Sequence, residues 1–249
     1  MERVSIVIPN FNCPYLWAAI RSCVKQTYQN LEIIIVDDAS TDRSGLNCVQ
    51  EFNDTRIRFI QRETNGGSAA ARNTGIRAAT GQIIAFLDAD DMLMENSVAK
   101  RVAILQRFAF VGIVCSYTYV VYGEWAVKHY KKYHECYAIK EGKLVPSPTG
   151  MIRKSLIDQY GFFDERIWFN EDREFWGRMI VTNKIPTIKL AIPTAYYRKH
   201  DSNKLSTMHN ADMLDKLKTN DIIPFWKNFE YLSDASDALQ LINILKTDE

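Results

Sequence analysis

Short apolar runs alternate with helical patterns along the first 110 residues. The runs RVSIVIP, LEIIIVDD, IRFIQR and GQIIAFLDADD are rich in β-branched residues, and each has the length of one strand. Between the first two, Leu16, Ile20 and Val24 recur at helical spacing. Strands that alternate with helices predict an α/β fold with a mostly parallel sheet, and the unbroken apolar runs indicate strands that are covered on both faces.

The alternation becomes less regular after residue 110. The run FAFVGIVCSYTYVVYG at 108–123 is too short and too polar for a membrane span, so it predicts a core strand. SLIDQYGFFDE and EDREFWGRMIV predict helices, and TIKLAIPTAYYRK predicts a last strand. Residues 129–150 are polar and rich in turn formers, which predicts a hairpin or a mobile loop, and helical spacing returns after about Asn210. We therefore expect a mixed second half.

Composition and charge narrow the class of protein. The 249 residues suffice for a sizeable core, and we find no linker or repeat that would argue for a second domain. A net charge of +1 lacks the basic excess that nucleic-acid binding needs. The five cysteines are scattered without a CxxC pair, which argues against a disulfide framework or a zinc site and favours a reducing cytosol. Pro9 and Asn10 interrupt the first apolar run, so we expect no signal peptide.

Two of the predicted strands end in aspartates, namely Asp37 with Asp38, and Asp88 with Asp90 and Asp91. The carboxyl ends of the strands in an open parallel sheet flank the crevice in which ligands bind. Gathered carboxylates there favour a hard divalent cation, Mg²⁺ or Mn²⁺, shared with substrate phosphates. Because an extended chain alternates sides, we expect Asp88 and Asp90 to share one side and Asp91 to face the other. Capping and turn formation remain alternative roles for any single aspartate.

The stretch NGGSAAARN offers a second candidate ligand contact. Gly66 and Gly67 permit close backbone approach, and Arg72 is a candidate partner for a diphosphate. The stretch lacks the P-loop and GxGxxG patterns, which argues against ATP hydrolysis and hydride transfer. A plain loop with a surface arginine is the alternative.

The stretch WFNEDREFW sets the acids Glu171 and Asp172 among aromatic residues. A carboxylate that is partly shielded from water has a raised pKa and can act as a general base, here beside a sugar-binding wall. The aromatic residues of that wall would be Trp168, Phe169, Phe175 and Trp176. The alternative is the acidic first turn of an amphipathic helix, which the helix dipole favours. Farther on, His200 is a candidate metal ligand or phosphate donor, or simply an exposed histidine.

In this order the pieces resemble the family-2 glycosyltransferases with the GT-A fold. The resemblance rests on VSIVIPNFN, SCVKQTYQNLEIIIVDDASTD, NGGSAAARNTGIRAATGQIIAFLDADD, GFFDERIWFNEDREFWGRM and YRKHDSNKLS. It implies a Rossmann-like, mostly parallel central sheet flanked by helices, in a single domain over 1–249. Within it, the resemblance implies a nucleotide-sugar-binding half at 1–110, an acceptor and catalytic half at 111–206, and a C-terminal helical tail at 207–249.

The resemblance also implies roles for individual residues. The enzyme would move a sugar from a nucleotide-diphosphate sugar, most often a UDP sugar, to an acceptor hydroxyl with inversion. Asp172, with Glu171 beside it, would be the catalytic base, and Asp88, Asp90 and His200 would hold Mn²⁺ or Mg²⁺. The residues that would contact the nucleotide sugar are Pro9, Asn10, Asp37, Asp38, Gly67, Arg72, Asp88 and Asp90.

The acceptor is less well defined by the sequence. Since we find no QxxRW pattern and no membrane span, we expect one sugar to be added per acceptor, which would be a glycan or a lipid-linked saccharide in bacterial surface polysaccharide assembly. We expect a cytoplasmic protein whose tail, with IIPFWKNFEYL, either contacts the inner face of the membrane or packs on its own core. Two alternatives remain, a sugar nucleotidyltransferase, which would release pyrophosphate, and a catalytically silent relative that only binds a nucleotide or glycan.

Overall fold

The computed structural model describes residues 1–42, 44–122, 133–134, 145 and 147–200. Its strands are β1 (Val4–Asn10), β2 (Leu31–Asp37), β3 (Ile57–Gln61), β4 (Ile83–Phe86), β5 (Met92–Leu93), β6 (Ile113–Tyr122), β7 (Tyr133–His134), β8 (Met151–Arg153) and β9 (Thr187–Lys199). Its helices are α1 (Leu16–Val24), α2 (Ser44–Gln50), α3 (Gly67–Ala78), α4 (Ser97–Arg107), α5 (Lys154–Tyr160) and α6 (Glu171–Gly177), with a 3₁₀ turn η2 (Ser147–Thr149) and a π-helical turn η3 (Arg178–Thr182).

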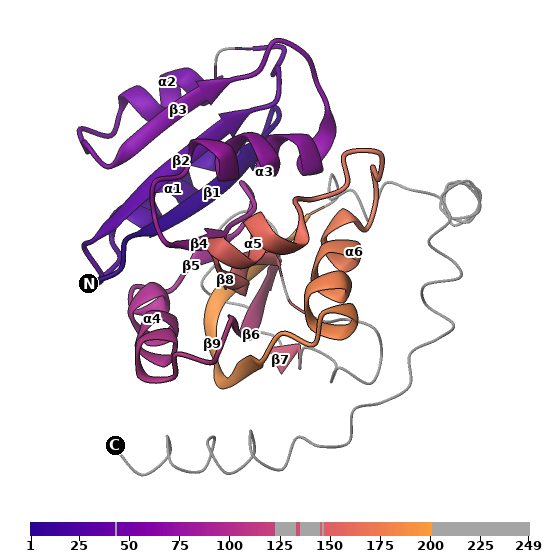
Figure 1. The fold of residues 1–249 in the computed structure, drawn as a ribbon. Helices are drawn as coiled ribbons and strands as arrows, with labels where there is room; N and C mark the ends of the chain where they lie inside the picture. The colour runs from indigo at the N-terminus through magenta and orange to yellow at the C-terminus, as the bar shows by residue number, and fades with distance from the viewer. Residues whose placement is uncertain (43, 123–132, 135–144, 146, 201–249) are drawn as a thin grey trace.

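One sheet runs through both halves of the described chain, in the order β3-β2-β1-β4-β8-β6-β9-β5, with β7 paired to β6 (Figure 1). The strands β3, β2, β1 and β4 are parallel, as the alternation of apolar runs and helices predicts. β8 is antiparallel to both of its neighbours, and β6 and β9 are again parallel to each other. The mostly parallel α/β fold with a mixed second half is therefore confirmed.

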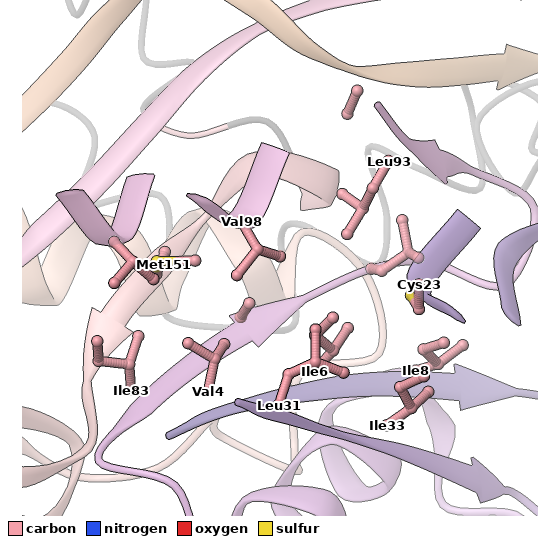
Figure 2. Packing of buried hydrophobic residues seen from close by; sticks show 14 of the residues in the cluster. Val4, Ile6, Ile8, Cys23, Leu31, Ile33, Ile83, Leu93, Val98 and Met151 are labelled. Atoms are coloured by element: carbon pink, nitrogen blue, oxygen red, sulfur yellow. The ribbon is translucent and has the colours of Figure 1, made fainter. Parts of the chain in front are cut away.

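Helices cover both faces of the sheet because its central strands are apolar on both sides. Alternate residues of β1 and β2, such as Val4, Ile6 and Ile33, pack with α1 and α4 in one core cluster, and Figure 2 shows this cluster from close by. The residues between them, such as Val7 and Ile34, pack with α3, α5 and α6 in the second cluster. This division by alternate positions is the packing that a strand with period 2 imposes.

Helix α3 lies unusually close to the sheet. A Cβ atom at Gly75 would lie 2.4 Å from a methyl carbon of Val7 in β1, so only glycine allows this approach. The closeness matters for the site, because α3 begins at the Gly66–Gly67 turn and carries Arg72. The helix thus brings both features to the carboxyl ends of β1, β2 and β4.

The sequence predicted most elements of the described chain in their correct order. The apolar run at 108–123 contains the core strand β6, and the last strand is β9. Most of the predicted hairpin at 129–150 and the whole tail at 207–249 lie outside the described residues. Within the described part of the chain, every helix is too short or too polar to cross a membrane.

Candidate functional site

The ends of β1 and β2 are joined by a buried hydrogen-bond cluster. The Nδ2 group of Asn10 donates to Oδ1 of Asp37 at 2.7 Å, and the Ser40 hydroxyl donates to the same oxygen at 2.6 Å. The other carboxylate oxygen of Asp37 accepts the Ser40 backbone N–H at 3.1 Å. Asp37 is thus used in the local turn, whereas Oδ1 of the buried Asn10 has no hydrogen-bond partner in the described structure. Of these two side chains, Asn10 is the one with a buried polar atom that lacks a partner among the described residues.

Asp38 holds the glycine turn in place. Its carboxylate accepts the backbone N–H of Gly67 at 2.7 Å and that of Gly66 at 3.1 Å, and it forms an ion pair with Arg62 at 3.0 Å. Gly67 has a φ of +81°, a conformation that side chains other than glycine disfavour. The turn therefore depends on Gly67 and on the carboxylate that accepts from its amide. Pro9, also predicted to contact the nucleotide, lies next to this region in β1.

Arg72 connects the two halves of the site from a buried position. Its guanidinium donates to Oδ1 of Asp88 at 2.7 Å and to Oε1 of Glu171 at 2.8 Å. Burial acts against the cation, but Asp88 and Glu171 more than offset this and raise the pKa of Arg72 above its ordinary value. The hypothesis of a surface arginine is wrong, since Arg72 is only 4% exposed. In the described structure, the positive charge of Arg72 contacts carboxylates of the protein itself.

The aspartates that follow β4 lie in a turn. The strand ends at Phe86, and the backbone N–H of Asp91 donates to the carbonyl of Asp88 at 3.1 Å. The expectation of an extended chain is therefore wrong for this segment, although the two carboxylates still interact, since burial, followed by the charge of Asp88, raises the pKa of Asp90. The Asp88 side chain contacts Arg72, whereas Oδ2 of Asp90 lies 3.0 Å from Nε2 of His200. The two aspartates thus have different partners.

Asp91 lies in the interior, as expected for a residue that secures the turn. It is fully buried, and its Oδ1 accepts the backbone N–H of Arg198 in β9 at 2.8 Å. Burial and the neighbouring charges of Asp90 and Asp88 raise the pKa of Asp91 well above its ordinary value. The side chain of Arg198 donates from Nε to the carbonyl of Asp90 at 3.0 Å. These two bonds attach the aspartate turn to the end of β9.

Glu171 and Asp172 form the first turn of α6, after Asn170 in a left-handed conformation with φ of 59°. The prediction that these two acids lie in the first turn of a helix is thus confirmed. Asp172 is partly buried, and its Oδ1 accepts the backbone N–H of Arg173 at 2.9 Å. Burial, followed by the charge of Glu171, raises the pKa of Asp172 to about 6, although Arg72 acts in the opposite direction. A carboxylate with this pKa can accept a proton near neutral pH.

The predicted aromatic wall is largely part of the core. Phe175 is fully buried and Trp176 is 2% exposed, and both pack against Phe86 on the sheet. The hypothesis that these two line a sugar site is therefore wrong. Trp168, by contrast, is 54% exposed, and its ring lies against Gly67 of the glycine turn. Trp168 is thus the exposed aromatic residue of this stretch.

The predicted metal ligands do not form a closed cage. Among the described residues, no group of three or more histidine, cysteine or acidic side chains is arranged to hold a metal ion. Asp90 and His200 nevertheless converge on each other, and Asp88 keeps 26% of its side chain exposed. One or two carboxylates fit a Mg²⁺ or Mn²⁺ ion that takes its remaining ligands from water and substrate phosphates. The side chains of Asp88, Asp90 and His200 therefore fit a cation that is shared with a bound substrate.

Sequence reasoning missed three residues that complete the site. Tyr15, just before α1, contacts both Arg198 and His200 with its ring. Tyr197 lies on β9, where burial and the charges of the nearby aspartates raise the pKa of its hydroxyl to about 12, so it stays protonated. Arg62 braces Asp38. The short segment YYRKH marks the last part of β9, but only the fold shows that this end of the strand meets the aspartate turn.

The α/β fold, with its acidic strand ends gathered at one edge of the sheet, is a GT-A glycosyltransferase fold. Residues 5–182 match the model of glycosyl transferase family 2, and the chain belongs to this family. The family-level prediction from the sequence is confirmed.

Relatives and solved structures agree with this assignment. The chain is 44% identical over 99 residues to the glycosyltransferase GlyG of Streptococcus pneumoniae, a match that covers 39% of this chain and only 33% of GlyG. It is 27% identical over 205 residues to WfgD of Escherichia coli, a UDP-Glc:alpha-D-GlcNAc-diphosphoundecaprenol beta-1,3-glucosyltransferase, with 80% of this chain and 78% of WfgD covered.

Two solved structures share the fold. S. aureus TarS 1–349 in complex with UDP-GlcNAc superposes with a TM-score of 0.71 at 22% identity, covering 97% of this chain and 70% of TarS 1–349. The mannosyltransferase PcManGT from Pyrobaculum calidifontis, in complex with GDP-Man and Mn²⁺, gives a TM-score of 0.68 at 17% identity, with 99% and 70% covered. At these identities the likeness establishes the fold.

Proposed function

We propose that this protein transfers a single sugar from a UDP sugar to a hydroxyl of a lipid-linked saccharide, with inversion, in surface polysaccharide assembly. The observation that carries the proposal is the network in which Arg72 joins Asp88 of the aspartate turn to Glu171 of α6. It supports the proposal because it joins Asp88, a proposed donor-binding acid, to Glu171, the neighbour of the proposed base Asp172. Family membership supports sugar transfer, and the name of WfgD supports the lipid-linked acceptor.

In the proposed reaction, Asp172 takes the proton of the acceptor hydroxyl as the oxygen attacks the anomeric carbon. The bond between that carbon and the diphosphate breaks from the opposite face, which inverts the configuration. A carboxylate with a pKa of about 6 is ionised at neutral pH and still basic enough for this step. We propose that Glu171 supports this step by holding the side chain of Arg72 through their ion pair.

The negative charge of the leaving diphosphate calls for cations. We propose that Asp88, Asp90 and His200 hold Mn²⁺ or Mg²⁺, which neutralises charge on the diphosphate when it is bound. The convergence of His200 on Asp90 supports this assignment. Arg72 would supply further positive charge if the cation takes its place on Asp88. Asn10, whose Oδ1 has no partner among the described residues, is the proposed contact to the nucleoside, with Pro9, Asp37, Asp38 and Gly67 shaping its surroundings.

The division of the chain and its cellular place belong to the same proposal. We assign donor binding to 1–110 and the acceptor and base to 111–206, and the tail at 207–249 lies outside the described residues. The enzyme would work in the cytoplasm at the inner face of the membrane, where a lipid-linked acceptor is presented. The exposed Trp168, four residues before the proposed base, is the proposed platform for a sugar ring of the acceptor.

The test is a panel of UDP, GDP and dTDP sugars with Mn²⁺ and a synthetic GlcNAc-diphosphate that carries a short lipid. We expect release of UDP and a product whose new linkage has the opposite anomeric configuration by NMR. Asp172→Asn should bind UDP normally and lose most of its turnover. In a parallel assay with UTP and a sugar 1-phosphate, release of pyrophosphate would instead establish the nucleotidyltransferase alternative. UDP binding without turnover on any acceptor would indicate a silent relative.

A further inference from the structure

The imidazole of His200 lies just beyond the last pair of β9. The strand ends at Lys199, which pairs with Tyr122 of β6, so the sheet does not fix the residue that follows. Yet the His200 ring lies at a defined place, with Nε2 3.0 Å from Oδ2 of Asp90. Contacts of its side chain must therefore supply the restraint that the sheet does not.

Tyr15 supplies such a contact from a distant part of the chain. Its ring centroid is 5.0 Å from that of His200, with the planes tilted at 57°. The guanidinium carbon of Arg198 lies 4.4 Å from the centroid of the same ring. Arg198 and His200 are two residues apart, so they project from the same side of the extended segment. The aromatic ring thus contacts both side chains at once.

Arg198 gives this arrangement a rigid base. It is 1% exposed, and its backbone N–H and its side chain bond to Asp91 and to the carbonyl of Asp90. A cation above an aromatic face is attracted by the ring, more so where water is excluded. Since Arg198 is fixed to the aspartate turn, the Tyr15 ring is fixed relative to that turn as well. The ring therefore lies against His200 from a position that Arg198 fixes.

We propose that Tyr15 is a positioning residue that holds the His200 imidazole against Asp90, and so sets the affinity for the divalent cation. This inference rests on the proposed function, in which Asp90 and His200 are cation ligands. The hydroxyl of Tyr15 makes no hydrogen bond within the described part of the chain, whereas the ring makes both contacts. The ring, and not the hydroxyl, carries the role.

The experiment compares Tyr15→Phe, which keeps the ring, with Tyr15→Leu, which removes it. Binding of Mn²⁺ in the presence of UDP is measured from the electron paramagnetic resonance signal of free Mn²⁺. Tyr15→Phe should bind within about twofold of the unchanged protein, and Tyr15→Leu roughly tenfold more weakly, as is common when a residue that orients a metal ligand is lost. Tyr28→Leu, which removes a tyrosine bonded to the carbonyl of Glu2 instead, should bind normally.

Folding is checked by circular dichroism and thermal unfolding. Tyr15 is half-buried and outside both core clusters, so we expect the leucine variant to fold, and Tyr15→Met is the replacement should it not. A folded Tyr15→Leu or Tyr15→Met protein with normal Mn²⁺ affinity would overturn the positioning role. So would equal losses in Tyr15→Phe and Tyr15→Leu. Normal binding by Asp90→Ala would instead remove the proposed metal site, and this inference with it.

Discussion

The buried ion pairs of Arg72 predict a large loss of stability in Arg72→Met. The side chains of Arg72 and Glu171 are 5% and 11% exposed, and that of Asp88 is 26% exposed. Removal of one member of a buried ion pair costs about 3–5 kcal/mol because an unpaired charge stays behind. Since Asp88 can regain water, we expect the lower end, about 3 kcal/mol, or a melting temperature lower by about 6–12 °C in a chain of this size.

The matched control is an ion pair of similar length on the surface. Arg166 contacts Asp164 at 2.6 Å, but its side chain is 89% exposed. Exposed pairs of this kind contribute little, so Arg166→Met should leave the melting temperature unchanged. Both variants are compared by thermal unfolding followed by circular dichroism and by urea titration at pH 7.

A second substitution tests the physical cause. If the cost in Arg72→Met comes from unpaired carboxylates, removing the charge of Glu171 as well should restore part of the stability. Arg72→Met with Glu171→Gln should therefore be at least about 1 kcal/mol more stable than Arg72→Met alone. Equal small losses in Arg72→Met and Arg166→Met would refute the argument, as would a double variant that is less stable than Arg72→Met.

Three further results are expected. Because the pKa of Asp172 is raised to about 6, kcat/KM should rise with pH to a plateau above an inflection near 6, and an inflection near 4 would speak against it. Burial would raise the pKa of Glu32, but hydrogen bonds from Ser5 and Thr80 outweigh it and lower the pKa to about 2. The resulting stability, on the order of 3 kcal/mol, is full above pH 4.5 and lost toward pH 2, so Glu32→Gln and the unchanged protein should converge in urea titrations as pH falls. Trp168→Ala should raise the acceptor KM roughly tenfold at constant UDP affinity, whereas Phe110→Ala, which removes an even more exposed aromatic ring, should change neither.

The sequence predicted the class of fold because its strongest signal is periodicity. Apolar runs separated by amphipathic helices leave few arrangements other than a parallel sheet covered on both faces. The same reasoning predicted that Asp37, Asp38 and the aspartates after β4 gather at one edge, since the carboxyl ends of parallel strands meet there. These predictions need only local pattern and a general rule of topology.

The partners of individual side chains could not be predicted in this way. Arg72 and Glu171 are 99 positions apart, and their contact depends on how α6 packs near α3. Phe175 and Trp176 were expected to face a ligand, but a Cβ atom at Gly150 would lie 2.3 Å from Trp176, which shows how tightly the core encloses that ring. The sequence spacing of Gly150, Phe175 and Trp176 does not show that these residues pack together in the core.

The acidic turn after β4 shows why composition alone misjudges such a site. Three aspartates within four positions suggest strong repulsion, yet each meets a different partner. Arg72 of α3 pairs with Asp88, His200 contacts Asp90, and the backbone of Arg198 donates to Asp91. The partners come from α3 and from β9 with the residue that follows it, so the fold gives each aspartate a polar contact, although burial and the charges of Asp90 and Asp88 still raise the pKa of Asp91. A donor with its cation must then exchange contacts of Asp88 and Asp90, whose side chains keep 26% and 23% of their surface exposed, whereas the buried Asp91 keeps its bond to the backbone of Arg198.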